Sequence, residues 1–240
     1  MSVGQDELLF NSSSSGSSEG GTNSGVPYSN AKGAFIPNIA DVDRLAGGTI
    51  YKKWFLYNDA PIDGLISPSV WLQQEPTFMT EVLGLGFDAS TDDDELQGNM
   101  TAFSADAYVA LVSSASDTRD AIIWGLSAAG DPLMEVITLN GTSEVLSLAE
   151  FSVVYAVQLD AINAGLTVLV KEGTAGTTRG TIGPSKLCCW LWVEAASKGS
   201  GIHLPDLPPG SPYGFWDKLT WAASVSGVRP NISVVAVEEN

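Results

Sequence analysis

The densest group of candidate metal ligands in the chain is acidic. Asp88 is followed by Asp92, Asp93 and Asp94 and then by Glu95, in the segment FDASTDDDELQG. Ca²⁺ takes several oxygen ligands, many of them from carboxylates, so this segment is a candidate calcium site. Its spacing departs from the EF-hand loop, which requires glycine at its sixth position. The alternative is a solvated acidic loop, and we expect no other cofactor.

Nucleophilic catalysis has few candidate residues. His203 is the single histidine, and the two cysteines, Cys188 and Cys189, are adjacent in LCCWLWVEA. An activated serine or cysteine needs a base beside it, and the G-x-S-x-G motif is absent from the sequence. Neighbouring residues of a strand point to opposite faces, so the two cysteines are predicted to be structural and not bridged to each other. We therefore expect no enzymatic activity.

The composition argues against two classes of partner. Lys and Arg total 11 against 28 Asp and Glu, which gives a formal net charge of -17, and Lys52-Lys53 is the only basic pair. Such a chain repels phosphate backbones, so nucleic-acid binding is not expected. No apolar stretch approaches the roughly 20 residues that span a bilayer, so no membrane contact is expected either. The glycine-rich segment Glu172–Gly183, which contains Arg179, lacks the phosphate-loop motif and is predicted to be a long loop between strands.

Aromatic residues are the candidates for contact with another molecule. In strands they stack on sugars, fill cores or line subunit interfaces. No carboxylate pair can be assigned as a glycosidase dyad. The candidate interface residues are Phe10, Trp54, Tyr213, Trp216 and Trp221.

Strands must position these side chains, because alternating apolar and polar residues run through most of the sequence. Asn140-Gly141 between two such segments is a strong hairpin signal. Within the predicted strand 144–160, a partly helical stretch near Leu148–Phe151 is an open alternative, while the density of β-branched and aromatic residues favours strand beyond it. The predicted strands are 49–58, 67–75, 80–88, 107–114, 119–127, 133–140, 144–160, 165–173 and 213–223.

The fold expected from this pattern is an all-β sandwich with an extended N-terminal arm. The arm is residues 1–33, where the Ser/Gly tract 11–26 predicts either a disordered tail or a segment that orders against neighbouring subunits.

The segment Ala121–Val170 resembles a module of virion proteins of tailed bacteriophages. The flanking segments DVDRLAGGTIYKKWFLYN (41–58) and 200–231 are similar to the opening and closing segments of phage structural proteins. Lys52 and Lys218 stand where arginine is common, and Trp221 replaces a valine region, which puts charge-specific contacts in doubt. The matching positions are Gly125, Gly130, Glu135, Leu139, Asn140, Gly141, Thr142, Val145 and Phe151.

The resemblance implies a β-sandwich with an inserted second β domain. The sandwich comprises residues 34–97 and 186–240, the inserted domain comprises residues 98–185, and both boundaries fall at predicted loops, where insertions are tolerated. The resemblance also implies a non-enzymatic structural component of the virion, assembled in the host cytoplasm, whose partners are other virion proteins and copies of itself. Among such roles the sequence favours a capsid decoration or cement protein, because an acidic, sandwich-like subunit suits an outer shell. A tail, neck or baseplate protein is the alternative, and a host-receptor or carbohydrate-binding module is a second one.

Overall fold

The computed structural model describes residues 8–13, 22–27, 45–74, 79–87, 94–162, 165–223 and 234–239. Antiparallel strands account for nearly all of its regular structure, and this confirms the all-β prediction. The helical turns η1 (Glu95–Gln97) and η2 (Lys198–Ser200) have three residues each.

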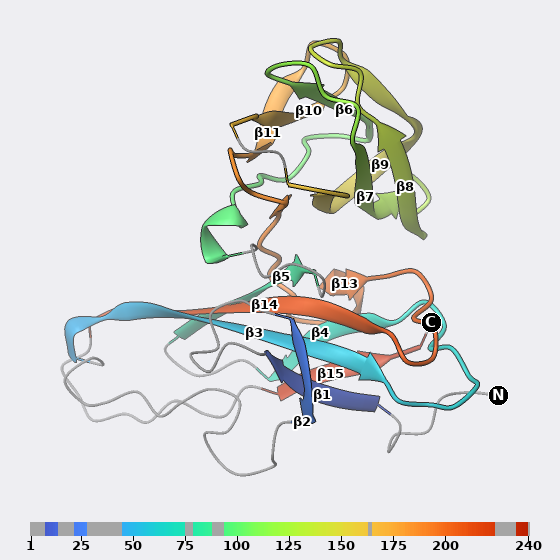
Figure 1. Cartoon of the computed structure of the whole chain (residues 1–240). Helices are drawn as coiled ribbons and strands as arrows, with labels where there is room; N and C mark the ends of the chain where they lie inside the picture. The colour runs from blue at the N-terminus through green and yellow to red at the C-terminus, as the bar shows by residue number, and fades with distance from the viewer. Residues whose placement is uncertain are drawn as a thin grey trace. The chain divides into compact units, whose positions relative to one another are not determined.

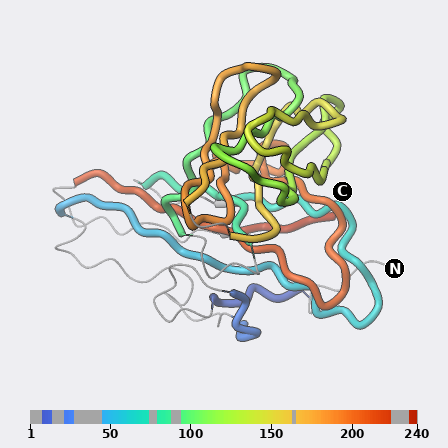
Figure 2. Tube along the Cα trace, turned by 45° about the horizontal axis from the view of Figure 1, so that its top comes forward, coloured from blue at the N-terminus to red at the C-terminus, as the bar shows by residue number. Residues whose placement is uncertain are grey.

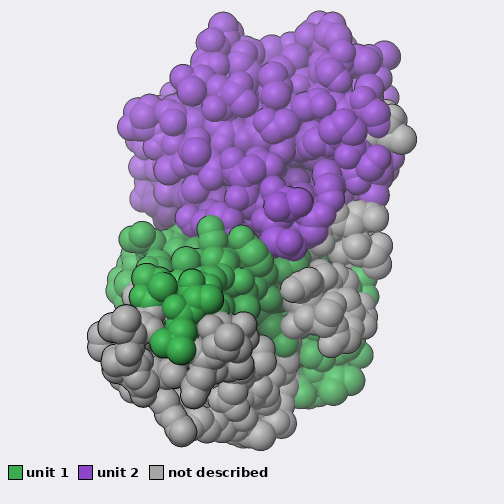
Figure 3. Space-filling view, turned by 90° about the vertical axis from the view of Figure 1, so that its left-hand side faces the viewer, with its two compact units in different colours: residues 1–89, 193–202, 206–240 green, residues 90–192, 203–205 purple. Residues whose placement is uncertain are grey.

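The chain divides into two compact units (Figure 3). Unit 1 comprises residues 1–89, 193–202 and 206–240, and unit 2 comprises residues 90–192 and 203–205. Unit 2 is therefore inserted between two parts of unit 1. The expected boundaries at 98 and 185 both lie inside unit 2, close to its limits at 90 and 192.

Unit 1 is built on a five-stranded sheet in the order β2-β1-β3-β14-β5. The two longest of these strands, β3 and β14, run side by side (Figures 1 and 2). The strands are β1 (Leu8–Ser13), β2 (Asn23–Pro27), β3 (Gly48–Asn58), β5 (Met79–Gly86) and β14 (Pro212–Trp221).

A smaller sheet has the order β13-β4-β15. Its strands are β4 (Ser69–Gln74), β13 (Ile202–His203) and β15 (Val234–Glu238). The central strand β4 buries Val70 and Leu72. The aromatic and aliphatic residues of the five-stranded sheet, such as Phe55 and Leu85, are also buried, so unit 1 has a core of its own.

Unit 2 contains a seven-stranded sheet with the order β11-β10-β6-β9-β7-β8, in which β12 also pairs with β9. The long strand β9 pairs with β6 near its start and with β7 and β12 near its end, and it encloses a core around Phe151 and Val157. The strands are β6 (Ala107–Ser113), β7 (Asp120–Ser127), β8 (Pro132–Thr138), β9 (Val145–Leu159), β10 (Val168–Glu172), β11 (Thr177–Ile182) and β12 (Cys188–Trp190).

The helical alternative near Leu148–Phe151 is ruled out, because these residues continue β9. The backbone is irregular there: the register against β6 shifts between Tyr108 and Ala110. Ser147 Oγ accepts from the Val109 N–H at 2.9 Å and donates to the Ala149 carbonyl at 2.7 Å. The weak strand propensity of this stretch therefore accompanies a bulge in the strand.

The described parts of the N-terminal segment pair within their own chain, which neither interpretation of it assumed. Residues 8–13 form β1, residues 23–27 form β2, and β1 pairs with both β2 and β3. The pairing gives the backbone groups of a polar segment hydrogen-bond partners that its side chains could not supply. The glycine-rich segment Glu172–Gly183 was predicted to be one long loop, but the loop covers only residues 173–176. β10 ends at Glu172, and β11 begins at Thr177.

We expect Gly125→Ala to destabilise unit 2 by about 3 kcal/mol, because an added methyl group would overpack a strand interface. A Cβ at Gly125 would lie 2.0 Å from the Val153 carbonyl oxygen and 2.8 Å from Cδ1 of Phe151. Urea unfolding monitored by amide hydrogen exchange in unit 2 measures this change.

Gly183→Ala is the matched control, because its Cβ would meet nothing closer than Lys186 Cγ at 3.9 Å. Equal stability of the two variants would contradict the close approach of β7 to β9.

Candidate functional site

The five residues predicted to form an interface all lie on the five-stranded sheet of unit 1. Phe10 is on β1, Trp54 on β3, and Tyr213, Trp216 and Trp221 are on β14. Because β14 pairs with β3 and β1 pairs with the other edge of β3, residues from three distant parts of the sequence meet there. The sheet is therefore the first candidate site.

Three of the five side chains are buried in the core of unit 1. Trp54 and Trp216 are fully buried, and Trp221 is 7% exposed. The rings of Phe10, Trp54 and Phe215 form a row, with centroid distances of 5.5 Å and 4.6 Å, and the second pair is stacked. Burial leaves only the partly exposed Phe10 and Tyr213 able to touch another molecule in this state.

Lys53 is fully buried on the opposite face of β3. Its Nζ donates to the Phe87 carbonyl oxygen at 2.9 Å and lies 5.5 Å and 5.9 Å from the ring centroids of Phe55 and Trp216. A carbonyl oxygen and two aromatic faces partly replace the water that the ammonium group has lost. Sequence reasoning missed this residue, because adjacent lysines in an exposed strand would show the same pattern.

Two buried carboxyl groups meet on the face that carries Trp54. Glu81 lies opposite Leu219 and Asp217 lies opposite Leu83, so the two acids are diagonal neighbours on β5 and β14. Each is 1% exposed. Within the described part of the chain, neither oxygen of Asp217 accepts a hydrogen bond from an N–H or a hydroxyl group. The Glu81 carboxyl is the group that faces it.

The pKa of Asp217 is raised well above its usual range. Burial is the largest cause, and the charge and hydrogen bond of Glu81 add to it. Two adjacent carboxylates in a low dielectric cannot both ionise, so the pair shares one proton. Lys52 lies opposite Asp217 on β3, and burial lowers the pKa of this lysine. Such a carboxyl pair could act as an acid–base couple, but its burial separates it from any dissolved substrate.

Only part of the candidate calcium site is described. Asp88, Asp92 and Asp93 lie outside the described residues. Asp94 caps η1, since its Oδ1 accepts from the Leu96 N–H at 3.2 Å, and its Oδ2 forms an ion pair with Lys186. Among the residues with described positions, no three His, Cys, Asp or Glu side chains are grouped to hold a metal ion.

The cysteines are free and fully buried, as the strand geometry predicted. The Cys188 thiol donates to Oε1 of Gln97 at 3.3 Å, and the same oxygen accepts from the Cys188 N–H at 3.2 Å. Burial raises the pKa of the Cys189 thiol. Cys189 is thus held as an inert thiol in the structure, because its reactive thiolate is disfavoured.

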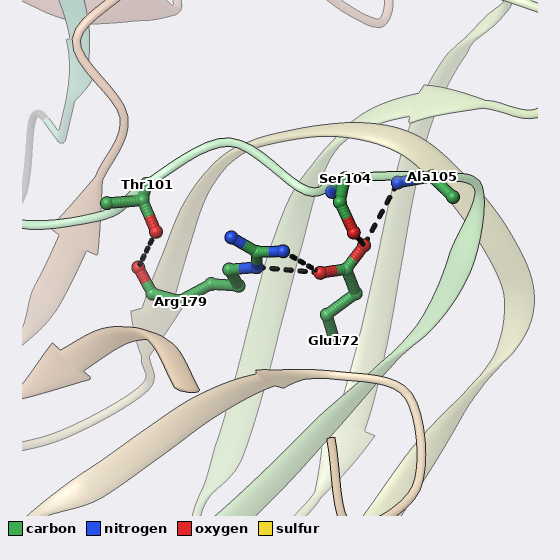
Figure 4. Close-up of polar contacts among 5 residues, drawn as sticks. All are labelled: Thr101, Ser104, Ala105, Glu172 and Arg179. Atoms are coloured by element: carbon green, nitrogen blue, oxygen red, sulfur yellow. Dashed lines mark hydrogen bonds and ion pairs between the residues drawn. The ribbon is translucent and has the colours of Figure 1, made fainter. Parts of the chain in front are cut away.

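The most highly hydrogen-bonded carboxylate of unit 2 is Glu172, at the end of β10 (Figure 4). Its Oε1 accepts from the Ser104 N–H at 2.6 Å, the Ser104 hydroxyl at 2.7 Å and the Ala105 N–H at 3.0 Å. Its Oε2 accepts from Nε of Arg179 at 2.7 Å and also from Nη2. The Arg179 carbonyl in turn accepts from the Thr101 N–H and hydroxyl. Glu172 therefore ties the chain before β6 to the β10–β11 hairpin.

Burial opposes ionisation of Glu172, but the hydrogen bonds from Ser104, Arg179 and Ala105 outweigh it and lower its pKa to about 2. A carboxylate with this many donors has no lone pair directed at solvent, so it acts as a structural clamp.

A second carboxylate closes the seam between β8 and β9. Oε1 of Glu135 accepts from the Leu148 N–H at 2.5 Å, and Oε2 accepts from the Ala149 N–H at 3.2 Å. The side chains beside this seam are apolar and face solvent: Met134 is 46% exposed, Val136 is 54% exposed and Leu148 is 91% exposed. Sequence reasoning selected Glu135 only through the resemblance. Alternation along β8 was the signal that could have identified its exposed neighbours.

Comparison with protein-family models, with curated proteins and with solved structures finds no match to this chain. None of the helical segments that the structure describes has the length and apolar character needed to cross a bilayer.

We expect Asp217→Asn to stabilise unit 1 at neutral pH by about 1–3 kcal/mol, because an amide N–H₂ can donate permanently to the Glu81 carboxylate. The raised pKa of Asp217 means that its proton contributes stability below the unfolded value of 3.8, and that this stability is lost as the pH rises toward the folded pKa. The stability of the variant should therefore not decline as the pH rises. Urea unfolding from pH 4 to pH 9 measures the free energy of unfolding of both proteins.

Asp131→Asn, in an exposed turn, is the control and should leave the pH profile of unit 1 unchanged. The shared proton would be ruled out if Asp217→Asn and the wild type lost stability in parallel as the pH rose.

Glu172→Gln should act in the opposite pH range. Because the pKa of Glu172 is lowered from 4.5 to about 2, its contribution is present above pH 4.5 and is lost as the pH falls toward 2. We expect the variant to lose about 1–3 kcal/mol at neutral pH, since the Arg179 charge loses its counter-charge. It should also show a shallower acid transition. Acid titration of unit 2 stability, with exposed Glu150→Gln as the control, tests both effects.

Proposed function

We propose that this chain is a non-enzymatic structural component of a tailed-phage virion, and specifically a capsid decoration or cement protein. The observation that carries the proposal is the exposure of three apolar side chains on the two strands that Glu135 joins: Met134 and Val136 on β8, and Leu148 on β9 beside the seam. Exposed apolar side chains on ordered strands are candidates for packing against another protein.

The polar clusters of the described residues support the same proposal. Glu172, Asp117 and Asp94 each pair with a basic side chain from a neighbouring loop or strand. Asp117 holds both Nε and Nη2 of Arg119, whose Nη1 donates to the Ala161 carbonyl. These contacts stabilise loops and leave their carboxylates occupied, as suits a subunit whose task is to keep its shape. The net charge of -17 would keep free subunits soluble before assembly.

A tail, neck or baseplate position would use the same seam with fewer copies. A carbohydrate-binding role through Trp216 is less well supported, because that ring is fully buried and cannot stack on a sugar. The number of copies per particle therefore distinguishes the positions within a virion.

We expect the purified chain to bind virions assembled from a genome that lacks its coding sequence. Co-sedimentation followed by quantitative mass spectrometry measures the copy number. A shell protein would give on the order of hundreds of copies, whereas a neck or baseplate protein would give about a dozen or fewer. A chain that never co-sediments with any particle would overturn the proposal.

Leu148→Glu should weaken this incorporation at least tenfold while leaving the melting temperature unchanged, because the side chain is 91% exposed. A tenfold loss corresponds to about 1.4 kcal/mol of binding free energy. Leu96→Glu is the matched control: this leucine of η1 is 75% exposed and lies away from the seam. Equal losses in the two variants would mean that added negative charge, and not the seam, reduces binding.

A further inference from the structure

The strand β1 joins the larger part of its unit through one edge, which pairs with β3, while its other edge pairs with β2. It lies between β2 and β3 in the sheet, so β3 is the strand that joins it to the larger part of unit 1 (Figures 1 and 2). Five residue pairs form this ladder, from Leu8 opposite Asn58 to Ser12 opposite Trp54. β1 is therefore an added strand that could leave the sheet without breaking the β3–β14 pairing.

The edge of β3 recognises β1 by backbone and side chain together. The backbone ladder sets the register, and the Phe10 ring packs against Trp54 at a centroid distance of 5.5 Å. Main-chain pairing combined with pockets for alternate side chains is the mode by which sheets bind extended segments. Every copy of the chain carries both the strand and the edge that receives it, so a neighbouring copy offers an identical site.

One side chain in this contact is poorly satisfied. Asn11 is 1% exposed, and its Oδ1 accepts no hydrogen bond within the described part of the chain. A buried amide oxygen without a donor weakens the contact that contains it. Release of β1 from its own sheet, which any exchange requires, is correspondingly easier.

The charge and the chain length also permit exchange. β1 and β2 have the sequences LLFNSS and NSGVP and contain no charged residue, although the whole chain carries a net charge of -17. A strand without charge can approach a second acidic copy with little repulsion. Residues 28–47 connect β2 to β3, and these 20 residues could span at most about 70 Å.

We propose that β1 is an exchangeable strand: in the assembled state, Leu8–Ser13 of one copy pairs with β3 of an adjacent copy in the register that it uses on its own β3. This inference deepens the proposed function and rests on it, because assembly is what brings copies close together. Neighbours in an assembly raise the effective concentration of the second site, so exchange adds a tether without any new contact surface.

Two single variants with different tags test the exchange. Leu9 and Tyr57 are register partners and are both partly exposed, so Leu9→Cys in one copy and Tyr57→Cys in the other would be joined by strand exchange. The two proteins are mixed, incorporated together into particles, oxidised, treated with an alkylating agent and separated on a non-reducing gel. The native Cys188 and Cys189 are fully buried and stay unreactive until denaturation.

We expect a disulfide-linked heterodimer that carries both tags, at least tenfold above the control. The control replaces Tyr57→Cys by Thr49→Cys, which is on β3 but lies outside the segment paired with β1. Particles that incorporate both variants without cross-linking above the control would overturn strand exchange and leave the proposed function intact. Failure of incorporation would count against the proposed function, and the mixed proteins would then be oxidised at high concentration in solution. Absence of the heterodimer there would likewise overturn the exchange.

Discussion

The pairing of β14 with both β3 and β5 is the interaction on which unit 1 depends. Residues Pro212–Trp221 pair with Gly48–Tyr57 on one side and, over Gly214–Trp221, with Met79–Gly86 on the other. The middle strand thus comes from the far end of the chain, after the whole of unit 2 has been inserted. Without β14, β3 and β5 would each have an unpaired edge, and their buried backbone groups would lack partners. Formation of the five-stranded sheet therefore requires pairing between residues far apart in the chain, which local sequence preferences alone cannot bring about.

The same pairing decides the state of the acidic residues. Asp217 lies on β14, which is the last strand of the five-stranded sheet in chain order. It meets Glu81 because β14 lies beside β5. Glu172 in unit 2 meets five donor groups in place of a second acid. The two carboxyl groups consequently have pKa values shifted in opposite directions. Burial is the largest cause of the raised pKa of Asp217, and Glu81 adds to it, whereas at Glu172 the hydrogen-bond donors outweigh burial.

The two units carry different kinds of surface. Unit 1 buries Trp54, Trp216 and Trp221 of its five-stranded sheet, so the contact proposed for this sheet rests on the backbone edge that β1 occupies. Unit 2 has a filled core around Phe151 and places apolar side chains of β8 and β9 in solvent. One type of contact uses hydrogen bonds and the other uses apolar area, so a subunit that carries both can be held in register and also stabilised by burial.

Much of the strand plan follows from local patterns. Alternation predicted the segments that became β3, β7 and β9 to within a few residues, because side chains of a half-buried strand must alternate between two environments. The Asn140-Gly141 turn also follows locally, since Gly141 adopts a φ of 59°, but its flanking strands β8 and β9 each pair with β7 and form no hairpin ladder with each other. The bulge near Ser147 involves a contact with Val109 of another strand, and no local pattern contains that contact.

The sequence by itself determined the all-β class, the buried and unbridged cysteines, and the strongly acidic character of the chain, which has few lysines and arginines. Only the tertiary structure decided which aromatic residues are interior, which acids share a proton, and that β1 belongs to the sheet of unit 1. The physical reason is that alternation records how many faces of a strand are apolar, whereas burial and pKa depend on which strands become neighbours. Those neighbours are chosen by pairings between residues far apart in the chain, such as Asp217 with Leu83.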